Sequence, residues 1–294
     1  MLAFITTLRH PQNSADYSRV ESLLQDTLAS LTQQTFDDYA VIIVGNRRPA
    51  FRLPDHTVFV QVDFLPPSDH RGPRTGAASV IWDKGTKNAV GLIAARDFRP
   101  EYVMFADADD FVHRDLAAFV HARPGQPGWV VNRGFMYSRR RNAYRRLRKF
   151  YRFCGTSFII PYDAYEVPPH LTVCATQQEI AEAFGERLEH VLEHGWAFDW
   201  WRQHGRVLEP LPFPGAVYHV QNGENHSDND LFGPALPYHP HLYRDFALRP
   251  SRDPGSTLWA SFGPAALRPD LRIPRPAFLQ PKSYLIGYSP PGDP

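Results

Sequence analysis

The sequence predicts an α/β protein in which helices flank a mixed, largely parallel sheet, followed by an irregular proline-rich tail. Two observations support this prediction. Short apolar runs alternate with segments of helical periodicity over the first 110 residues, which is the pattern of βα units. The chain has 294 residues, of which 43% are hydrophobic and 21% charged, and this composition is typical of one large or two small globular domains.

Charge and cysteine content limit the partners and the compartment. The 32 basic and 31 acidic residues nearly cancel, so overall charge does not indicate nucleic-acid binding, and no nucleic-acid partner is expected. Cys154 and Cys174 lack the spacing of a zinc site, which favours two reduced thiols. The N-terminus lacks the features of a signal peptide and no apolar run is long enough to cross a bilayer, so a cytoplasmic protein is expected.

The first part of the chain should supply the core of the sheet. Apolar side chains recur at helical spacing between Val20 and Leu31 and again over residues 77–96, which predicts two crossover helices. Gly85 and Gly91 lower the helix propensity of the second of these segments. Strands rich in Val, Ile, Phe or Tyr are expected at residues 2–8, 39–45, 57–63 and 102–106.

The rest of the chain has a weaker pattern. Thr176 and Glu179 form the sequence signature of a capping box, which predicts a helix over 176–193. Proline and the loss of periodicity beyond Gly233 predict an irregular extension, 233–294, after one domain, 1–232, with halves 1–110 and 111–232. The remaining expected elements are a helix at 114–122, strands at 128–136 and 155–160, a short helix carrying Asp199, and a proline-interrupted strand at 206–220.

Three carboxylates follow the fourth predicted strand, at Asp107, Asp109 and Asp110. Carboxylates this close together repel one another unless a cation lies between them, and clusters of carboxylates favour hard ions such as Mg²⁺ or Mn²⁺. Ligands of open α/β sheets bind beyond the carboxyl ends of the strands, where this segment falls. The alternative is an acidic N-cap for a helix beginning near Val112. The segment therefore predicts a metal and phosphate site, with the cap as its rival.

The residues before the acidic segment add a family resemblance. Lys87-Asn88, then Gly91, a helix of small residues, and an apolar strand ending in Asp-x-Asp-Asp resemble the nucleotide-sugar half of GT-A glycosyltransferases, especially the family 2 group. The resemblance covers residues 1 to about 110. It implies the GT-A fold, a Rossmann-like nucleotide-diphospho-sugar transferase architecture.

The resemblance implies roles for the residues around the acidic segment. Asp109 would bind the metal ion that bridges the donor diphosphate, and Asp107 would position the ribose or a metal-bound water. Asp110 would support the site, and Lys87 and Asn88 would lie near the donor. For Lys87 the alternative is a solvated helix face.

Residues after the first and third strands are weaker candidates for donor contacts. The resemblance places nucleotide contacts at Arg9 and His10 and a base contact at Asp63. The alternatives are a surface loop for the basic pair and a turn residue for Asp63. Lys84 has the same solvated alternative as Lys87.

A second block of the family pattern surrounds Asp199. The spacing of Asp199, Arg202 and Gly205 resembles that of the family 2 helix that begins with a Glu-Asp pair. Phe198 replaces the first acid of that pair. The resemblance makes Asp199 the general base of an inverting transfer, because a carboxylate among aromatic side chains can have a raised pKa. Arg202 would support it. A helix-capping Asp at the rim of an aromatic core is the alternative.

A histidine after this helix completes the expected metal site. By resemblance, His219 would be a further Mn²⁺ or Mg²⁺ ligand, and His226 is the reserve candidate. A hydrogen-bonded structural histidine is the alternative for His219. Cys154 to Ser157 would form a small-residue turn facing the acceptor, or simply a tight turn before a strand.

Residues 139–152 contain eight Arg or Lys in fourteen positions, interleaved with aromatic and apolar side chains at roughly helical spacing. Such a segment could hold the protein at the inner face of an anionic membrane, or it could bind an acidic or phosphorylated glycan acceptor. A solvated loop is the alternative.

These features together predict a hexosyltransferase-like enzyme. It would move a sugar from a nucleotide-diphosphate donor to a hydroxyl of a glycan, lipid-linked or small-molecule acceptor, in glycan, cell-surface polysaccharide or glycoconjugate synthesis. A catalytically silent nucleotide-sugar-binding protein is the first alternative. A Mg²⁺-dependent phosphohydrolase is the second, although its Asp-x-Asp is normally followed by Thr or Val rather than by Asp110 and Phe111.

Overall fold

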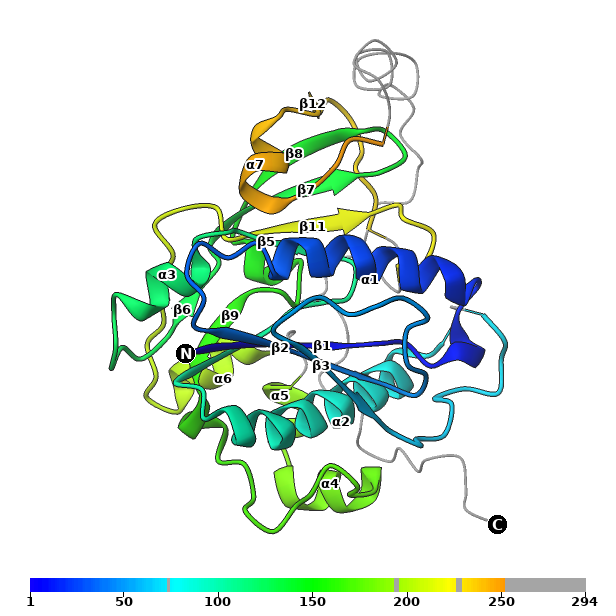
Figure 1. Ribbon diagram of the computed structural model, residues 1–294, viewed down its shortest axis with the longest axis vertical. Coiled ribbons are helices and arrows are strands. Elements are labelled where there is room, and N and C mark those ends of the chain that lie inside the picture. The colour runs from blue at the N-terminus through cyan, green and yellow to red at the C-terminus, as the bar shows by residue number, and fades with distance from the viewer. Residues whose placement is uncertain (73–74, 193–195, 226–228, 252–294) are drawn as a thin grey trace.

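Two mixed sheets and the helices that cover them make up the described chain (Figure 1). The structure is a computed structural model that describes residues 1–72, 75–192, 196–225 and 229–251. The first sheet has seven strands in the order β10-β6-β9-β4-β1-β2-β3. They are β1 (Leu2–Thr7), β2 (Tyr39–Gly45), β3 (Thr57–Gln61), β4 (Tyr102–Phe105), β6 (Trp129–Val130), β9 (Phe158–Pro161) and β10 (Glu209–Pro210).

The two long helices cover opposite faces of the first sheet, α1 (Tyr17–Leu31) on one and α2 (Ala77–Ala95) on the other (Figure 1). Side chains alternate along β1, so Phe4 packs in the core cluster with α1 and Ile5 packs in the cluster with α2. A Cβ at Gly91 would lie 2.3 Å from Ile5 Cγ2, so glycine is what allows α2 to approach β1 so closely.

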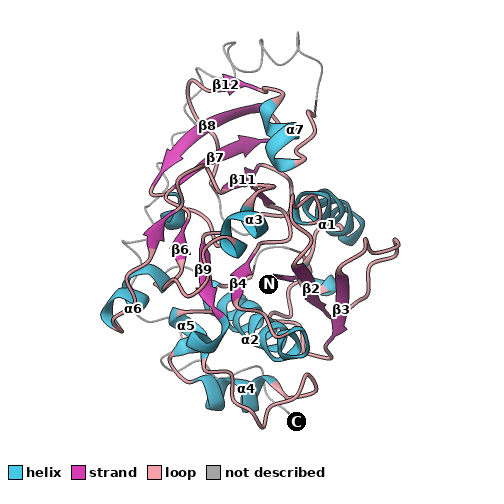
Figure 2. Cartoon of the chain, turned by 60° about the vertical axis from the view of Figure 1, so that its left-hand side comes forward, coloured by secondary structure: helices cyan, strands magenta, loops and turns pink. Residues whose placement is uncertain are grey.

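The parallel part of this sheet, β3-β2-β1-β4, contains a topological switch point. The chain runs from β1 outward through β2 to β3 and then returns to the other side of β1 as β4. The antiparallel strand β9 extends the sheet beyond β4 (Figure 2). The loops that follow β1 and β4 therefore diverge at one edge, and this is where open α/β sheets bind their ligands.

The second sheet has the order β12-β8-β7-β11-β5. Its core includes Phe135 and Tyr144, which pack with Leu242 and Phe246 of α7 (His241–Phe246). Its strands are β5 (Phe111–Val112), β7 (Arg133–Ser138), β8 (Ala143–Arg148), β11 (Ala216–Val220) and β12 (Leu236–Pro237). The other helices are α3 (Leu116–His121), α4 (Gln177–Phe184), α5 (Arg187–His190), α6 (Ala197–Gln203) and four short 3₁₀ turns at Pro11–Asn13, Arg96–Phe98, Phe150–Arg152 and Tyr162–Tyr165.

The structure confirms the predicted α/β class, with mixed sheets flanked by helices. The four strands expected in the first part of the chain are present within two residues of their predicted bounds, and so is α2. The capping box is also present, because Thr176 Oγ1 accepts from the backbone N–H of Glu179 and the Glu179 carboxylate accepts from the backbone N–H of Thr176.

Three predicted elements were wrong in extent. The strand expected at 128–136 is two strands, β6 and β7, that lie in different sheets, and the strand at 206–220 divides in the same way into β10 and β11. The helix expected over 176–193 ends at Phe184, because Gly185 adopts a φ of 54° that no α-helix contains, and residue 193 lies outside the described chain.

Two predictions about the later chain were also wrong. The basic run at 139–152 was expected to have helical spacing, but it contains strand β8, paired with β7. The expectation of irregular structure after Gly233 is wrong for residues 236–246, where β12 forms an edge strand of the second sheet and α7 packs against it. Residues 252–294 of the expected extension lie outside the described chain, and the division at residue 232 stays a prediction.

Candidate functional site

The acidic segment begins where β4 ends, at the switch point beside β1. Its turn is closed by the backbone N–H of Asp110, which donates to Asp107 O at 3.0 Å. The side chain of Asp110 is buried, whereas Asp107 and Asp109 are half-buried. The segment therefore offers two partly accessible carboxylates at the edge that the topology predicts for a ligand.

Asp110 accepts hydrogen bonds from three donors that belong to two other segments. Its Oδ2 accepts from Thr156 Oγ1 at 2.7 Å and from Cys154 Sγ at 2.9 Å, and its Oδ1 accepts from the backbone N–H of His219 at 3.1 Å. Burial, followed by the charges on Asp109 and Asp107, raises the pKa of Asp110 well above its usual range. Asp110 thus joins the end of β4 to the turn before β9 and to β11.

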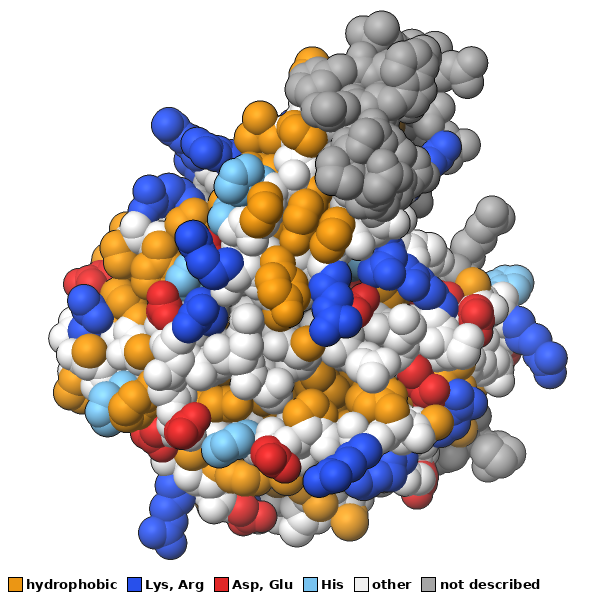
Figure 3. Space-filling model, turned by 45° about the horizontal axis from the view of Figure 1, so that its top comes forward, with side chains coloured by type: hydrophobic (Ala, Val, Ile, Leu, Met, Phe, Trp, Pro, Cys, Tyr) orange, Lys and Arg blue, Asp and Glu red, His pale blue; other side chains and the backbone are white. Residues whose placement is uncertain are grey.

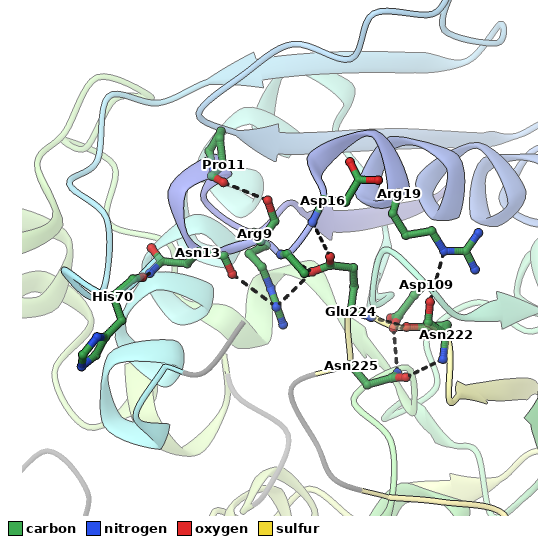
Figure 4. A network of polar contacts seen from close by, with 12 residues as sticks. Arg9, Pro11, Asn13, Asp16, Arg19, His70, Asp109, Asn222, Glu224 and Asn225 are labelled. Atoms are coloured by element: carbon green, nitrogen blue, oxygen red, sulfur yellow. Dashed lines mark hydrogen bonds and ion pairs between the residues drawn. The ribbon is translucent and has the colours of Figure 1, made fainter. Parts of the chain in front are cut away.

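Asp109 is held by two side-chain amides from the loop after β11. Its Oδ2 accepts from Asn222 Nδ2 at 2.8 Å and from Asn225 Nδ2 at 3.0 Å (Figure 4). Burial, together with the charge on Asp107, raises the pKa of Asp109 to about 6. No described residue donates to the other carboxylate oxygen, Oδ1.

Lys84 forms an ion pair with Asp107, the first carboxylate of the acidic segment. Its Nζ lies 2.6 Å from Asp107 Oδ1, and both side chains are partly exposed, at 22% and 27%. The sequence left a solvated helix face open as the alternative for Lys84, because the spacing along α2 does not reveal that its side chain reaches the segment after β4. A small pocket adjoins it, lined in part by Asn88, Gly155, Ala197 and Trp201.

Lys87 and Asn88 lie on α2, but the protein itself occupies their polar nitrogens. Lys87 is fully buried and its Nζ donates to Asp83 Oδ2 at 2.7 Å and to Leu8 O at 3.0 Å. Asn88 Nδ2 donates to Leu192 O at 2.7 Å. These hydrogen bonds connect α2 to the end of β1 and to the chain after α5. The predicted contacts of both residues with the donor stay predictions.

Arg9 and His10 follow β1 on the other side of the switch point. Arg9 Nη1 donates to Asn13 O and lies 3.3 Å from Glu224 Oε2. Burial lowers the pKa of Arg9, although Glu224 counteracts this. His10 Nδ1 accepts from the backbone N–H of Gln12 at 3.1 Å, which opens the first 3₁₀ turn.

Two candidates lie on the exposed surface. Asp63 is exposed just after β3. Asp199 and Arg202 form an exposed ion pair at 3.3 Å, with side chains 55% and 65% exposed. Ala197 and Trp201, four residues apart, form the buried face of α6, so a residue midway between them points the other way. The expectation that aromatic side chains enclose Asp199 was therefore wrong.

The imidazole of His219 bonds the backbone of the acidic segment. Its Nδ1 lies 3.1 Å from the backbone oxygen of Asp109, so Nδ1 carries the proton and donates it. Burial lowers the pKa of His219 to about 3, and the ring is therefore neutral. The buried Nε2 has no partner among the described residues, and the ring lies near Phe111 and Tyr137. The structure shows no hydrogen bond between this ring and the Asp109 carboxylate, and the role of His219 as a metal ligand stays a prediction. His226 lies outside the described residues.

The carboxylates of Asp107 and Asp109 are the candidate ligands of a divalent metal ion. Within the described chain, no three His, Cys, Asp or Glu side chains converge on one point as a preformed metal site. Asp107 and Asp109 nevertheless provide hard carboxylate oxygens, and their mutual repulsion is what a divalent cation relieves. Mg²⁺ and Mn²⁺ commonly take one or two protein carboxylates and complete their shell with water and phosphate oxygens. The pair fits such an ion.

The loop after β11 contains residues that the sequence did not reveal as part of the site. Asn222 and Asn225 reach Asp109, and Glu224 reaches Arg9 and the start of α1. The sequence signal was a polar loop directly after a buried strand, but nothing in it indicated that this loop returns to the switch point. The pairing of β11 with β5, which follows the acidic segment, brings it there.

Comparisons with known proteins find only distant structural similarity. No protein-family profile and no curated protein matches the chain. The structure of S. aureus TarS is 12% identical, with 74% of this chain and 36% of that one covered and a TM-score of 0.38. S. aureus TarS 1-349 in complex with UDP-GlcNAc is also 12% identical, with 78% and 61% covered and a TM-score of 0.39. The matched region spans less than two thirds of these chains. Separately, no helix in the described residues is long and apolar enough to cross a membrane.

Proposed function

We propose that this protein is a metal-dependent glycosyltransferase that moves a sugar from a nucleotide-diphosphate donor to an acceptor hydroxyl. The observation that carries the proposal is the position of the acidic segment. Asp107 and Asp109 lie at the carboxyl end of β4, at the switch point with β1, and two basic side chains, Arg9 and Lys84, flank them. Such an edge suits a diphosphate, because carboxylates can bind its metal ion and cations can balance its charge.

In this proposal Asp107 and Asp109 hold Mn²⁺ or Mg²⁺, which when bound neutralises charge on the leaving diphosphate. Lys84 exchanges its partner Asp107 for a phosphate oxygen when the donor arrives. Arg9, held by Glu224, lies on the β1 side, where the nucleotide would bind. Asp63, and Asn88 in the lining of the small pocket, are the further proposed donor contacts.

Asp199 is the proposed base, which makes the transfer inverting. Its carboxylate would take the proton of the acceptor hydroxyl while that oxygen attacks the anomeric carbon. The bond from the anomeric carbon to the phosphate oxygen breaks, and the nucleoside diphosphate leaves from the opposite face. The exposure of Asp199 is compatible with an acceptor that enters from solvent.

The second sheet offers a surface for an anionic partner. Strands β7 and β8 contain no Asp or Glu and carry Arg133, Arg145, Arg146 and Arg148. Arg133 of β7 is the cross-strand partner of Arg148 of β8, and Arg146 lies on the same face. Like charges in such positions repel, so an anion would stabilise them. Leu236 of β12 is exposed, and so is Tyr243 of α7, the helix that packs against this sheet. Basic and apolar side chains adjoin each other in Figure 3.

We assign this surface to an anionic membrane, with the protein peripheral to its cytoplasmic face. Binding to vesicles with and without anionic lipid tests the assignment. Arg146→Gln together with Arg148→Gln should weaken binding about 30-fold, because each basic residue contributes about 1 kcal/mol near such a surface. Arg52→Gln with Arg71→Gln is the charge-matched control. Retained vesicle binding in the Arg146/Arg148 variant, or binding only to soluble polyanions, would overturn the membrane assignment.

The experiment that tests the transferase proposal is thermal unfolding with UDP, GDP, dTDP and CMP sugars, with and without Mn²⁺. A donor that binds only the folded protein raises the unfolding temperature. We expect one nucleotide to do so in a Mn²⁺-dependent way, and Asp109→Asn to abolish the rise. If no nucleotide sugar shifts the wild-type transition, the proposal fails.

A further inference from the structure

We propose that Asn222 and Asn225 are positioning residues that turn the Asp109 carboxylate so that Oδ1 alone faces the metal ion. This inference rests on the proposed function and deepens it. Both side-chain amides donate to the same oxygen, Asp109 Oδ2, at 2.8 and 3.0 Å (Figure 4). A carboxylate with one oxygen occupied in this way presents the other oxygen in a defined direction, as the hydrogen-bonded carboxylates of metal sites do.

The direction of both amides is fixed by the backbone of their own loop. Asn222 Oδ1 accepts from the backbone N–H of Glu224 at 2.9 Å, and Asn225 Oδ1 accepts from the backbone N–H of Asn222 at 3.1 Å. Since each amide oxygen is engaged by a donor, each amide nitrogen has to point toward Asp109. Both nitrogens also donate to His219 O, at 3.2 and 2.8 Å, so their donor capacity is fully used.

The loop itself is anchored to the first sheet's side of the site. The Glu224 carboxylate accepts from the backbone N–H of Asp16 at 2.9 Å and pairs with Arg9, and Arg19 Nε donates to Asn222 O at 3.1 Å. Asp16 is the N-cap of α1, so the loop is attached to a long helix. Positioning groups on such a rigid support hold their orientation, which is the requirement for a preorganised site.

Metal affinity distinguishes positioning from general stabilisation. Free Mn²⁺ can be measured by its electron paramagnetic resonance signal during titration of the full-length protein with Mn²⁺ alone. Loss of a group that orients a metal ligand typically weakens metal binding 10- to 100-fold. We expect Asn225→Ala and Asn222→Ala each to weaken Mn²⁺ binding about tenfold. Asn229→Ala is the matched control, because Asn229 bonds Tyr218 rather than Asp109 and should leave the affinity unchanged.

The outcomes separate this inference from the proposed function. Wild-type affinity in a folded Asn225→Ala protein would overturn the positioning role and leave the transferase proposal standing. Absence of Mn²⁺ binding in the wild type would overturn both. A structural role alone would lower the thermal unfolding temperature without changing the affinity of the folded fraction. If Asn225→Ala does not fold, Asn222→Ala gives the same comparison, since it removes the other donor.

Discussion

The acidic segment after β4 and the surface of α6 were expected to be two halves of one site, and the structure treats them differently. Asp109 and Asp110 accept hydrogen bonds from the turn before β9, from β11 and from the loop after β11. Asp199, in contrast, contacts Arg202 one helical turn away on an exposed face. The position of a residue at the end of a central strand is set by the topology of the sheet. The position of a residue on a short surface helix is set by the rotation of that helix about its axis.

The largest expected effect separates the two regions directly. Asp109→Asn should lower metal-dependent transfer by about 100- to 1000-fold, because groups that stabilise developing charge commonly contribute that much. The free protein should not lose stability, since the substitution removes a half-buried charge repelled by Asp107. Donor-dependent turnover and thermal unfolding provide the two measurements. Undiminished turnover would remove the acidic segment from the mechanism.

The corresponding change on α6 is Asp199→Asn. If Asp199 is the base, transfer should fall about 100-fold while donor affinity stays the same, since general-base catalysis contributes roughly 10²- to 10⁴-fold. Initial rates and donor binding by calorimetry measure the two quantities. Glu182→Gln, an exposed carboxylate on α4, is the control. A wild-type rate for Asp199→Asn would exclude this base and leave donor binding unaffected.

A third change tests whether the hydrogen bonds of the acidic segment stabilise the fold. Thr156→Val removes the donor to Asp110 Oδ2 and the acceptor of the Asp107 backbone N–H. Unsatisfied buried groups cost about 1–3 kcal/mol, so the free energy of unfolding in denaturant should fall by that amount. Thr172→Val, at an exposed position, should change it by less than about 0.5 kcal/mol. Equal effects at both positions would contradict the anchoring role of Asp110.

The smallest effect concerns the counter-charge of Asp107. Lys84→Gln should tighten Mn²⁺ binding and weaken nucleoside-diphosphate binding, each by up to about fivefold, because partly exposed ion pairs contribute little. Lys149→Gln, on the exposed part of the basic run, should change neither affinity. Changes of the same sign for both ligands would show that Lys84 does not exchange Asp107 for phosphate.

Much of the fold followed from local pattern. Strand β2 is fully buried and reads as a continuous apolar run, and α1 carries its apolar residues on one face. No local sequence pattern indicated that a predicted strand would divide into two strands in different sheets. Val130 and Phe135 look like neighbours in one strand, yet they belong to β6 and β7 in different sheets. A Cβ at Gly134 would lie 2.3 Å from the Phe150 ring, a close contact that only packing reveals.

That Asp107, Asp109 and Asp110 follow directly after β4 could be read from the sequence, because a buried strand does not continue into unpaired carboxylates. The hydrogen-bond partners of those carboxylates, in contrast, depend on how distant segments pack together. Asn222 and Asn225 reach the Asp109 carboxylate across more than 110 residues, and the imidazole of His219 bonds the Asp109 backbone oxygen. The physical reason is that hydrogen bonds between distant segments depend on the register of β11 with β5 and β7, and a sequence read residue by residue does not contain that register.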